Sequence, residues 1–308
     1  MIEAVVLDGF LQAMVRTATP LAFAALGELV AERAGVINIG LEGAIACGAL
    51  ASFVVAMTLG PEAGFLAGGV AGMAVALVFA FFVIALRAQQ IIAGAAVSML
   101  GLAVSASLHR VVVASGSPSA HVDTLTAVRI PGLADLPLVG TALFAQPVTT
   151  YVLYLLVPAV SWWLYHTTGG IALRAVGEHP PAVTAAGHSA PTLQLVALLV
   201  CGFLAGLGGS TLVVAHSGTF SDGMSAGRGF IAIAIVALGR WTPRGVVGGA
   251  LLFGGGGARQ FLAQSMGWRI PYTLILAFPY VLTLMAMAAF RGSRAAPAAL
   301  GHTLEPIP

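Results

Sequence analysis

Asn38 and Glu42 are the polar side chains whose types and spacing first indicate chemistry. They lie in one apolar stretch, and on a helix they would stand one turn apart on the same face. An ionisable side chain inside a membrane span costs on the order of 2.5–3.5 kcal/mol, so it is a functional-site candidate. Gly35, Gly40 and Gly43 flank the pair, and such glycines favour an unwound backbone that presents carbonyls to a cavity. The pattern predicts contact with a polar solute or a buried structural clamp.

Two arginines also fall within apolar stretches. Arg16 and Arg259 are each candidates to neutralise Glu42 or to line a polar pathway. Pairing with Glu42 would be a purely structural role, because intramembrane polar groups often serve helix packing. From these residues alone, both the pathway role and the structural role stay open.

The residue types exclude most enzyme chemistry. All 13 basic residues are arginine, so the chain has no lysine for a Walker A phosphate loop or for a Schiff base. It has no paired aspartates within apolar stretches and no H-E-x-x-H metal motif. Cys47 and Cys201 indicate neither a disulfide framework nor a zinc site. We predict no catalytic residue, metal site or cofactor, and the net charge of +2 indicates no nucleic-acid partner.

The composition indicates the class of protein that positions these residues. Of 308 residues, 59% are hydrophobic and 8% are charged, and the mean hydropathy is +0.99. Ordinary soluble domains are about 45–50% apolar and about 25% charged, so this chain has too little charge to cover a soluble surface. It is predicted to be an all-α polytopic membrane protein. We expect no cleaved signal peptide, because the first ten residues lack a basic region.

Nine apolar stretches are candidates for spanning helices, which need about 20 residues each. The seventh is short and is expected to be a broken or re-entrant segment, so we expect about 8–10 transmembrane helices. They form one transmembrane domain, residues 1–290, followed by a cytoplasmic C-terminal tail, residues 291–308. The stretches are residues 10–31, 36–57, 64–86, 90–112, 149–166, 192–215, 229–240, 245–264 and 271–290.

The placement of arginines gives the orientation, because cytoplasmic loops carry an excess of positive charge. If the loop 167–191 is cytoplasmic, seven arginines lie inside and four lie outside. Nine crossings then place the N-terminus outside. The inner arginines are Arg33, Arg87, Arg174, Arg240, Arg244, Arg291 and Arg294, and the outer ones are Arg110, Arg129, Arg228 and Arg269.

Two stretches between the spans carry signals of their own. Residues 114–148 contain four prolines and no helical period, so we expect a long external loop, either functional or a plain connection. In the cytoplasmic loop 167–191, Pro180-Pro181 can begin a short helix and Gly187 can end it. The predicted helix, residues 181–186, is more ordered than a linker requires, and a plain connector is the alternative.

Glycines recur every fourth residue in two of the predicted spans. Gly64, Gly68 and Gly72 would line one helix face, and Gly202 and Gly206 repeat the spacing. Small residues at this spacing let helix backbones approach closely in a membrane. These faces are therefore predicted to be packing surfaces.

Three ordered motifs resemble the permease subunits of bacterial ABC importers for nucleosides and simple sugars, which belong with the branched-chain amino acid and ribose permeases. The first motif is ERAGVINIGLEG at Glu32–Gly43. The second, LRAVGEHP at Leu173–Pro180, is similar to the family's cytoplasmic coupling segment. The third is SGTFSDGMSAGRGFIA at Ser217–Ala232, followed by ALGRW at Ala237–Trp241. The resemblance extends along nearly the whole chain.

The resemblance implies an all-helical permease fold with two related halves, which pairs with an identical or homologous permease subunit. ATPase subunits would dock from the cytoplasm and bind the ATP, so the chain is not itself expected to be an enzyme. An extracytoplasmic binding protein would deliver the solute. The expected place is the bacterial cytoplasmic (inner) membrane, and the expected solute is a nucleoside, with simple sugars as the alternative.

Motif positions and span positions together give the candidate residues. His179 stands where the coupling segment commonly has asparagine. Ser98 stands where family members commonly carry a polar amide, and if that amide contacts the solute, we expect a solute choice that differs from the nucleoside norm. The predicted substrate pathway contains Asn38, Glu42, Gln90, Ser98 and Arg259. The residues predicted to couple the chain to the ATPase are Arg174, Gly177, Glu178, Pro181, Ala182 and Gly187.

A secondary transporter or channel driven by an ion gradient is the alternative from another class. It would need a proton or sodium site of paired carboxylates within the spans. Only Glu42 lies clearly inside a predicted span, with Glu28 near a helix end. The ABC permease is therefore the prediction, and the ion-driven transporter ranks behind it.

Overall fold

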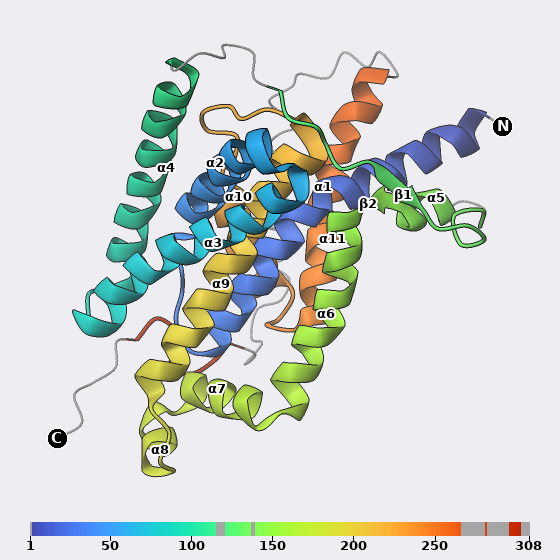
Figure 1. Ribbon diagram of the computed structural model, residues 1–308. Coiled ribbons are helices and arrows are strands. Elements are labelled where there is room, and N and C mark those ends of the chain that lie inside the picture. The colour runs from blue at the N-terminus through green and yellow to red at the C-terminus, as the bar shows by residue number, and fades with distance from the viewer. Residues whose placement is uncertain (1, 115–120, 137–138, 266–280, 282–295, 303–308) are drawn as a thin grey trace.

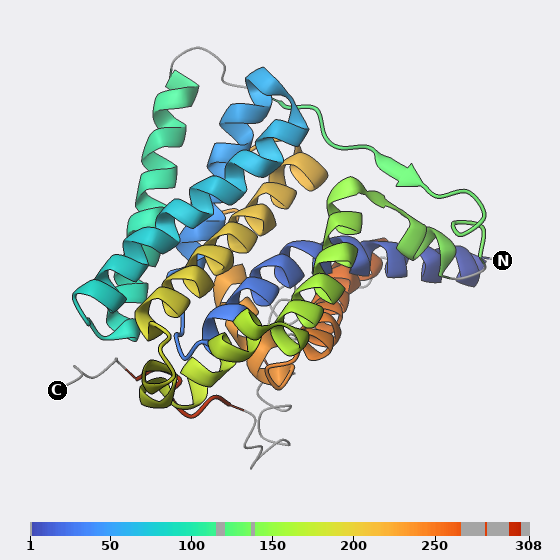
Figure 2. The same cartoon turned by 60° about the horizontal axis from the view of Figure 1, so that its bottom comes forward.

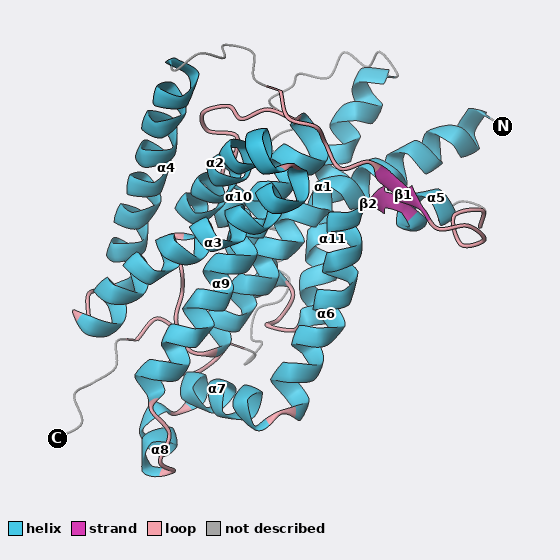
Figure 3. Cartoon of the chain, viewed as in Figure 1, coloured by secondary structure: helices cyan, strands magenta, loops and turns pink. Residues whose placement is uncertain are grey.

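The computed structural model describes residues 2–114, 121–136, 139–265, 281 and 296–302 (Figure 1). Within these ranges the chain is helical apart from one two-stranded antiparallel sheet (Figure 3). The all-α class that the composition predicts is confirmed. The described elements are α1 (Ile2–Arg33), α2 (Leu41–Leu59), α3 (Pro61–Ala80), the π-helical turn η1 (Phe81–Ala85), α4 (Gln90–Ala114), β1 (Ala127–Arg129), α5 (Gly140–Phe144), β2 (Ala145–Pro147), α6 (Val148–His166), α7 (Thr168–Glu178), α8 (Pro180–Ala185), α9 (Ala190–Leu212), the π-helical turn η2 (Val213–Ser217), α10 (Arg228–Leu238) and α11 (Pro243–Ser265).

Six of the described helices are long and apolar enough to cross a membrane, and they coincide with the first six predicted spans. The seventh predicted span, 229–240, forms the short helix α10, and the eighth, 245–264, lies within α11. The ninth, 271–290, lies outside the described residues. The six spanning candidates are Val6–Arg33, Leu41–Leu59, Pro61–Ala85, Gln90–Val112, Val148–His166 and Ala190–Ser217.

Helices α1 and α9 form the centre of the bundle. In each of them 78% of the apolar window is buried, against 33% in α4 and 22% in α6. Figure 2 shows α4 at one edge of the molecule. The outer helices expose large apolar side chains such as Leu77, Ile92, Leu100 and Leu155. Lipid tails are as apolar as these side chains, so this surface suits a bilayer and not water.

Helices α2, α3 and α9 pack through glycines, as the spacing predicts. A Cβ atom on Gly48 of α2 would lie 2.6 Å from the Cα of Gly206 in α9. A Cβ atom on Gly72 of α3 would lie 2.7 Å from that same Cα atom. Real Cβ atoms do not come so close, so these backbones are in direct contact. We call this set the glycine interface, and it consists of Gly48, Gly64, Gly68, Gly72, Gly202 and Gly206.

The predicted external loop 114–148 is more ordered than expected. It contains β1, α5 and β2, where Ala127 pairs with Pro147 and Arg129 pairs with Ala145. The prolines break helical periodicity but are compatible with a short strand at an edge, which is why the sequence pattern missed these elements. The amide of Val122 donates to Gly218 O at 2.8 Å, so the segment folds back over the end of α9 and η2.

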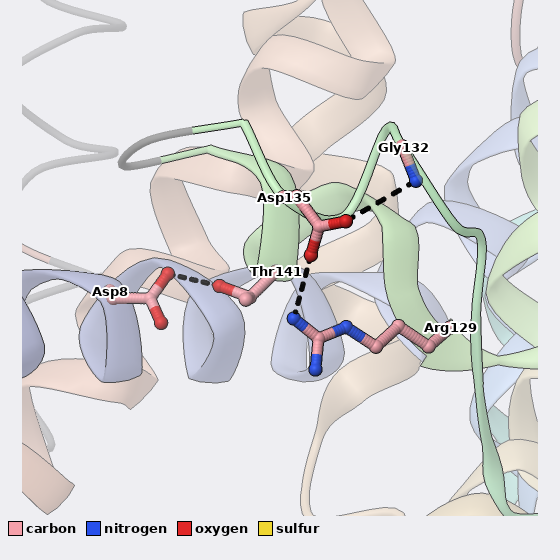
Figure 4. Close-up of polar contacts among 5 residues, drawn as sticks. All are labelled: Asp8, Arg129, Gly132, Asp135 and Thr141. Carbon is pink, nitrogen blue, oxygen red and sulfur yellow. Dashed lines mark hydrogen bonds and ion pairs between the residues drawn. The ribbon is translucent and has the colours of Figure 1, made fainter.

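Side chains fix the far part of this segment against the start of α1. Thr141 of α5 donates a hydrogen bond to Asp8 of α1 (Figure 4). Asp135 accepts from Arg129 Nη2 at 3.0 Å and from the amide of Gly132 at 3.4 Å. The N-terminal part of α1 therefore carries a small folded platform, which consists of β1, α5 and β2.

Candidate functional site

The connection between α1 and α2 is unwound, and it contains the first sequence motif. Gly35 has φ of 85°, a conformation that glycine adopts without strain, and α2 begins only at Leu41. Asn38 therefore lies in the connection and not on a helix. The prediction that Asn38 and Glu42 share one helix face is wrong, because α1 ends at Arg33 and α2 begins only at Leu41, so that Glu42 is helical and Asn38 is not.

Three side chains from neighbouring helices bind the backbone of this connection. Glu28 Oε1 accepts from the amide of Asn38 at 2.9 Å, and Gln90 Oε1 accepts from the amide of Ile37 at 2.9 Å. Ser98 donates from Oγ to Ile39 O at 2.6 Å. Backbone groups freed by a broken helix inside a membrane need such partners, because lipid offers none.

The side chain of Asn38 completes this arrangement. Its Nδ2 donates to Cys201 Sγ at 3.4 Å, and the Cys201 thiol in turn donates to Glu28 Oε2 at 3.3 Å. Asn38 Oδ1 is buried and has no partner among the described residues. The chain of contacts ties the connection to the two central helices, α1 and α9.

Glu42 binds the N-terminus of α10. Its carboxylate accepts from the amides of Gly227 at 2.8 Å and Gly229 at 2.7 Å. The first amides of a helix lack partners within the helix and carry partial positive charge, so a buried carboxylate is a suitable cap. Glu42 is thus bound by backbone amides, and among the described side chains it forms no ion pair with Arg16, one of the two arginines that the sequence suggested.

Helix α10 has about half the length of a membrane span. Eleven residues at 1.5 Å each give about 16 Å, against a hydrocarbon thickness of about 30 Å. It begins beside the first turn of α2 at Glu42 and ends near the C-terminal end of α1, where Arg33 donates from Nε and Nη2 to Trp241 O at 2.9 and 2.6 Å. The expected broken segment is confirmed as a short helix.

Glu32 is a buried carboxylate that the sequence did not single out. It is 3% exposed, and Trp241 Nε1 donates to its Oε2 at 2.5 Å. Glu28, which is fully buried, precedes it by one helical turn, so the i, i+4 spacing of the two glutamates was the available signal. From the sequence, Glu28 is expected near a helix end, and its pairing with Glu32 as two buried carboxyl groups is not predicted.

Four of the five predicted pathway residues have described side chains, and all four are buried. Asn38, Glu42, Gln90 and Ser98 are 1%, 3%, 2% and 3% exposed. The backbone of Arg259 lies in α11, and its side chain lies outside the description. In this conformation Glu42, Gln90 and Ser98 bind backbone groups at helix breaks, and the Asn38 side chain binds the Cys201 thiol. We call Glu28, Asn38, Glu42, Gln90 and Ser98 the polar joint.

Ser225 occupies a spacing that resembles a nucleophile motif, Gly223-Met-Ser-Ala-Gly227. Its side chain is 1% exposed, and its Oγ has no hydrogen-bond partner among the described residues. It also lies in turns before α10 and not after a strand. Without a base to activate it, this serine gives no indication of catalysis.

The predicted coupling residues lie in α7, α8 and the turn after them, which stand together at one end of the molecule (Figure 1). The expectation of a single short helix in 167–191 missed α7, because Gly169 and Gly170 weaken the helical pattern. The cap is clear, since Thr167 Oγ1 accepts from the amide of Gly170 at 3.1 Å. Helix α8, Pro180–Ala185, confirms the predicted short helix within one residue at each end.

Two of these residues face inward. Gly177 is buried, and a Cβ atom there would lie 3.0 Å from the carbonyl carbon of Arg33. The guanidinium of Arg174 lies 4.7 Å from the centre of the Tyr165 ring, within cation–π range. Both residues therefore attach α7 to the spanning helices.

The other four residues are exposed: Glu178, Pro181, Ala182 and Gly187. His179 begins α8 by accepting the Ala182 amide at its Nδ1, at 3.1 Å. Asparagine is a preferred residue at this capping position, so the histidine performs the same structural task. Gly187, with φ of 86°, reverses the chain after α8. Residues 178–187 therefore form a small, firmly capped, exposed structure, which we call the exposed knob.

Residues 10–287 match the family model described as the branched-chain amino acid transport system / permease component. No solved structure matches the chain.

Curated relatives cover nearly the whole chain. The guanosine ABC transporter permease protein NupQ of Bacillus subtilis is 32% identical and spans 92% of both chains. The nucleoside ABC transporter permease protein NupC of Lactococcus lactis is 31% identical and also spans 92% of both chains. TsgC13 of Haloferax volcanii, provisionally named a glucose ABC transporter permease protein, is 37% identical over 90% of this chain and 85% of its own. Each of these organisms has a second ABC transporter permease protein that matches part of the chain. The chain therefore belongs to the branched-chain amino acid transport system permease family, and it is a multi-pass protein of the cytoplasmic membrane and a permease subunit of an ABC transporter.

Proposed function

We propose that this chain is the permease subunit of an ATP-driven importer of nucleosides. The observation that carries the proposal is the full-length similarity to a guanosine permease and a nucleoside permease. Simple sugars are the second candidate, because a relative of similar identity carries a glucose assignment. Both kinds of solute are uncharged and polar, and both suit a pathway whose described polar candidates, Asn38, Glu42, Gln90 and Ser98, form no ion pair with a described side chain.

The energy for transport comes from a partner chain. The permease contains no lysine with which to build a phosphate-binding loop, so ATP binds to a separate ATPase and the permease itself has no cofactor. The exposed knob of α8, with Glu178, Pro181 and Ala182, is the docking surface for that ATPase. Because Gly177 packs on the end of α1, movement of the knob reaches the central helices directly.

The remaining partners dock on other faces. A second permease, identical or homologous, completes the pathway between two subunits, and the pairs of permease proteins in the relatives' organisms support this arrangement. An extracytoplasmic binding protein delivers the solute to the platform of β1, α5 and β2 at the opposite end from α7 and α8 (Figure 1).

An ion-driven carrier would require a carboxyl pair that is free to bind and release its ion. Glu28 and Glu32 form a buried pair, but Glu28 accepts from the Asn38 amide and the Cys201 thiol, and Glu32 accepts from Trp241. These hydrogen bonds fit a structural role of the pair.

The first test is purification of the complex with gentle extraction, followed by transport in vesicles. We expect an ATPase to accompany the permease, and we expect uptake of radiolabelled guanosine to require ATP and to stop with vanadate. Uptake of glucose and not of guanosine would show that the transported solute is a sugar. Uptake by the isolated chain under an ion gradient would contradict the importer.

The second test addresses the docking surface. Ala182→Arg places a long charged side chain on the exposed knob, and we expect it to lower uptake by about tenfold or more, within typical coupling free energies, while the subunit stays in the membrane. Ala182→Ser changes the same position without bulk and should transport normally. Normal uptake by Ala182→Arg would rule out this surface as the ATPase contact.

A further inference from the structure

A short C-terminal segment, Ala296–His302, lies across the end of the molecule that carries α7. Pro297 is buried there. The segment folds as a turn, in which the amide of Leu300 donates to Pro297 O at 3.2 Å and the amide of His302 donates to Ala299 O at 3.1 Å. These hydrogen bonds give Ala296–His302 a defined local structure.

The segment binds the coupling helix on one side. The amide of Ala299 donates to Gly177 O at 2.8 Å, and the amide of Ala298 donates to Glu178 Oε2 at 3.3 Å. Gly177 and Glu178 are the last two residues of α7, directly before α8. The segment therefore binds Gly177 and Glu178, the residues through which a displacement of the exposed knob would first reach the rest of the chain.

The segment binds the polar joint on its other side. The amide of Gly301 donates to Gly35 O at 3.2 Å, and Gln90 Nε2 donates to His302 O at 3.0 Å. The same Gln90 accepts the amide of Ile37 at its Oε1, so one buried side chain joins the tail to the α1–α2 connection. Gly301 has φ of 79°, a conformation that favours glycine.

We propose that Ala296–His302 is a mechanical link that transmits movement of the coupling helix to the α1–α2 connection. The inference rests on the proposed function, since it assigns a role within ATP-driven transport. Four hydrogen bonds connect the two sides of the link, and three of them are donated by backbone amides of the tail. Main-chain bonds at both ends fix the distance between coupling helix and joint.

The variant that tests the link is Ala299→Pro, because proline lacks the amide that donates to Gly177. Ala299→Ser is the matched control, since it keeps the amide and adds one oxygen atom. In the reconstituted complex of permeases, ATPase and binding protein, we expect Ala299→Pro to lower uptake per ATP hydrolysed by about tenfold, in the range of typical coupling free energies. The control should match the unmodified complex, and equal uptake per ATP in Ala299→Pro would overturn the link.

Hydrogen exchange in the unmodified complex tests the same idea without a variant that could misfold. A link must keep both contacts through the cycle, so the amides of Ala299 and Gly301 should stay protected in the nucleotide-free and the vanadate-trapped complex. Loss of protection of either amide in either state would overturn the link. An unmodified complex without ATP-dependent uptake would instead refute the importer itself, so the two failures are distinguishable.

Discussion

At the glycine interface, α2, α3 and α9 pack closely because glycine has no side chain to separate their backbones. At the polar joint, buried polar side chains bind the backbone where helices are interrupted. Both respond to the same condition: lipid is as apolar as leucine, so apolar burial alone does not draw membrane helices together. At the glycine interface backbones touch and dispersion contacts accumulate. At the joint, side chains bind backbone groups that would otherwise lack partners in a membrane.

The difference separates a rigid part of the molecule from a part that can change shape. Unbroken helices in close backbone contact resist bending, so α2, α3 and α9 should move as one body. The joint lies at two interruptions of the helical backbone, before α2 and before α10. Interrupted helices are typical of the site around which the halves of a transporter move.

The largest expected effect comes from Gly206→Ala, which places a Cβ atom against Gly68 O and 2.9 Å from Gly68 C. Both neighbours are backbone atoms, so relief requires helix separation. We expect the free energy of unfolding to fall by about 3 kcal/mol or more, at or beyond the upper end of the cost of overpacking. Thermal unfolding in detergent should show this as a lower midpoint.

The matched control is Gly248→Ala in α11, where a Cβ atom would have no atom of the described residues within 4 Å. Alanine is favoured over glycine within a helix by about 0.5–1 kcal/mol, so this variant should be unchanged or slightly more stable. Equal midpoints for the two variants would show that the glycine interface is not a close contact.

A smaller loss is expected for Glu42→Gln at the polar joint. Glutamine offers one acceptor oxygen where the two amides of Gly227 and Gly229 need partners. The unmatched buried amide should lower the free energy of unfolding by about 1–3 kcal/mol. Thermal unfolding and uptake should be measured together, since normal stability with lost uptake would mean that Glu42 serves the solute and not α10.

Glu62→Gln is the control for that change. Glu62 also stands in the first turn of a helix, α3, but it is exposed. Substitutions at such surface positions usually alter stability by less than about 0.5 kcal/mol. A loss as large as that of Glu42→Gln would point to general charge effects and not to the cap.

The sequence predicted long apolar helices, glycine contacts and the α8 helix, because each depends on local spacing. Six spans follow from runs of apolar residues, and α8 follows from Pro180-Pro181 and Gly187. The polar joint was only partly predictable. Asn38 and Glu42 stood out as polar residues in an apolar run, but their partners, such as Cys201 and Gly229, are more than 100 residues away. No local pattern encodes such pairs.

The smallest effect is expected outside the polar joint, in the cap of α8. His179→Ala removes the acceptor for the Ala182 amide and should cost about 1 kcal/mol, the typical value of a helix cap. His179→Asn should retain the cap, because its side-chain oxygen can accept the same bond. Faster hydrogen exchange of the Ala182 amide in His179→Ala, but not in His179→Asn, would confirm the cap, and equal exchange would contradict it.

The docked tail has a consequence for how the protein is made. Ala296–His302 is synthesised after every other described element, so its bonds to Gly177 and Gln90 cannot form until all of those elements have been made. A ribosome that stops early would release a chain with its spans in place but with Gly177 O, Gly35 O and one donor of Gln90 left without these partners. Such chains would therefore lack these contacts at the end of the molecule where we propose that the ATPase docks, and assembly of the complex would select against them.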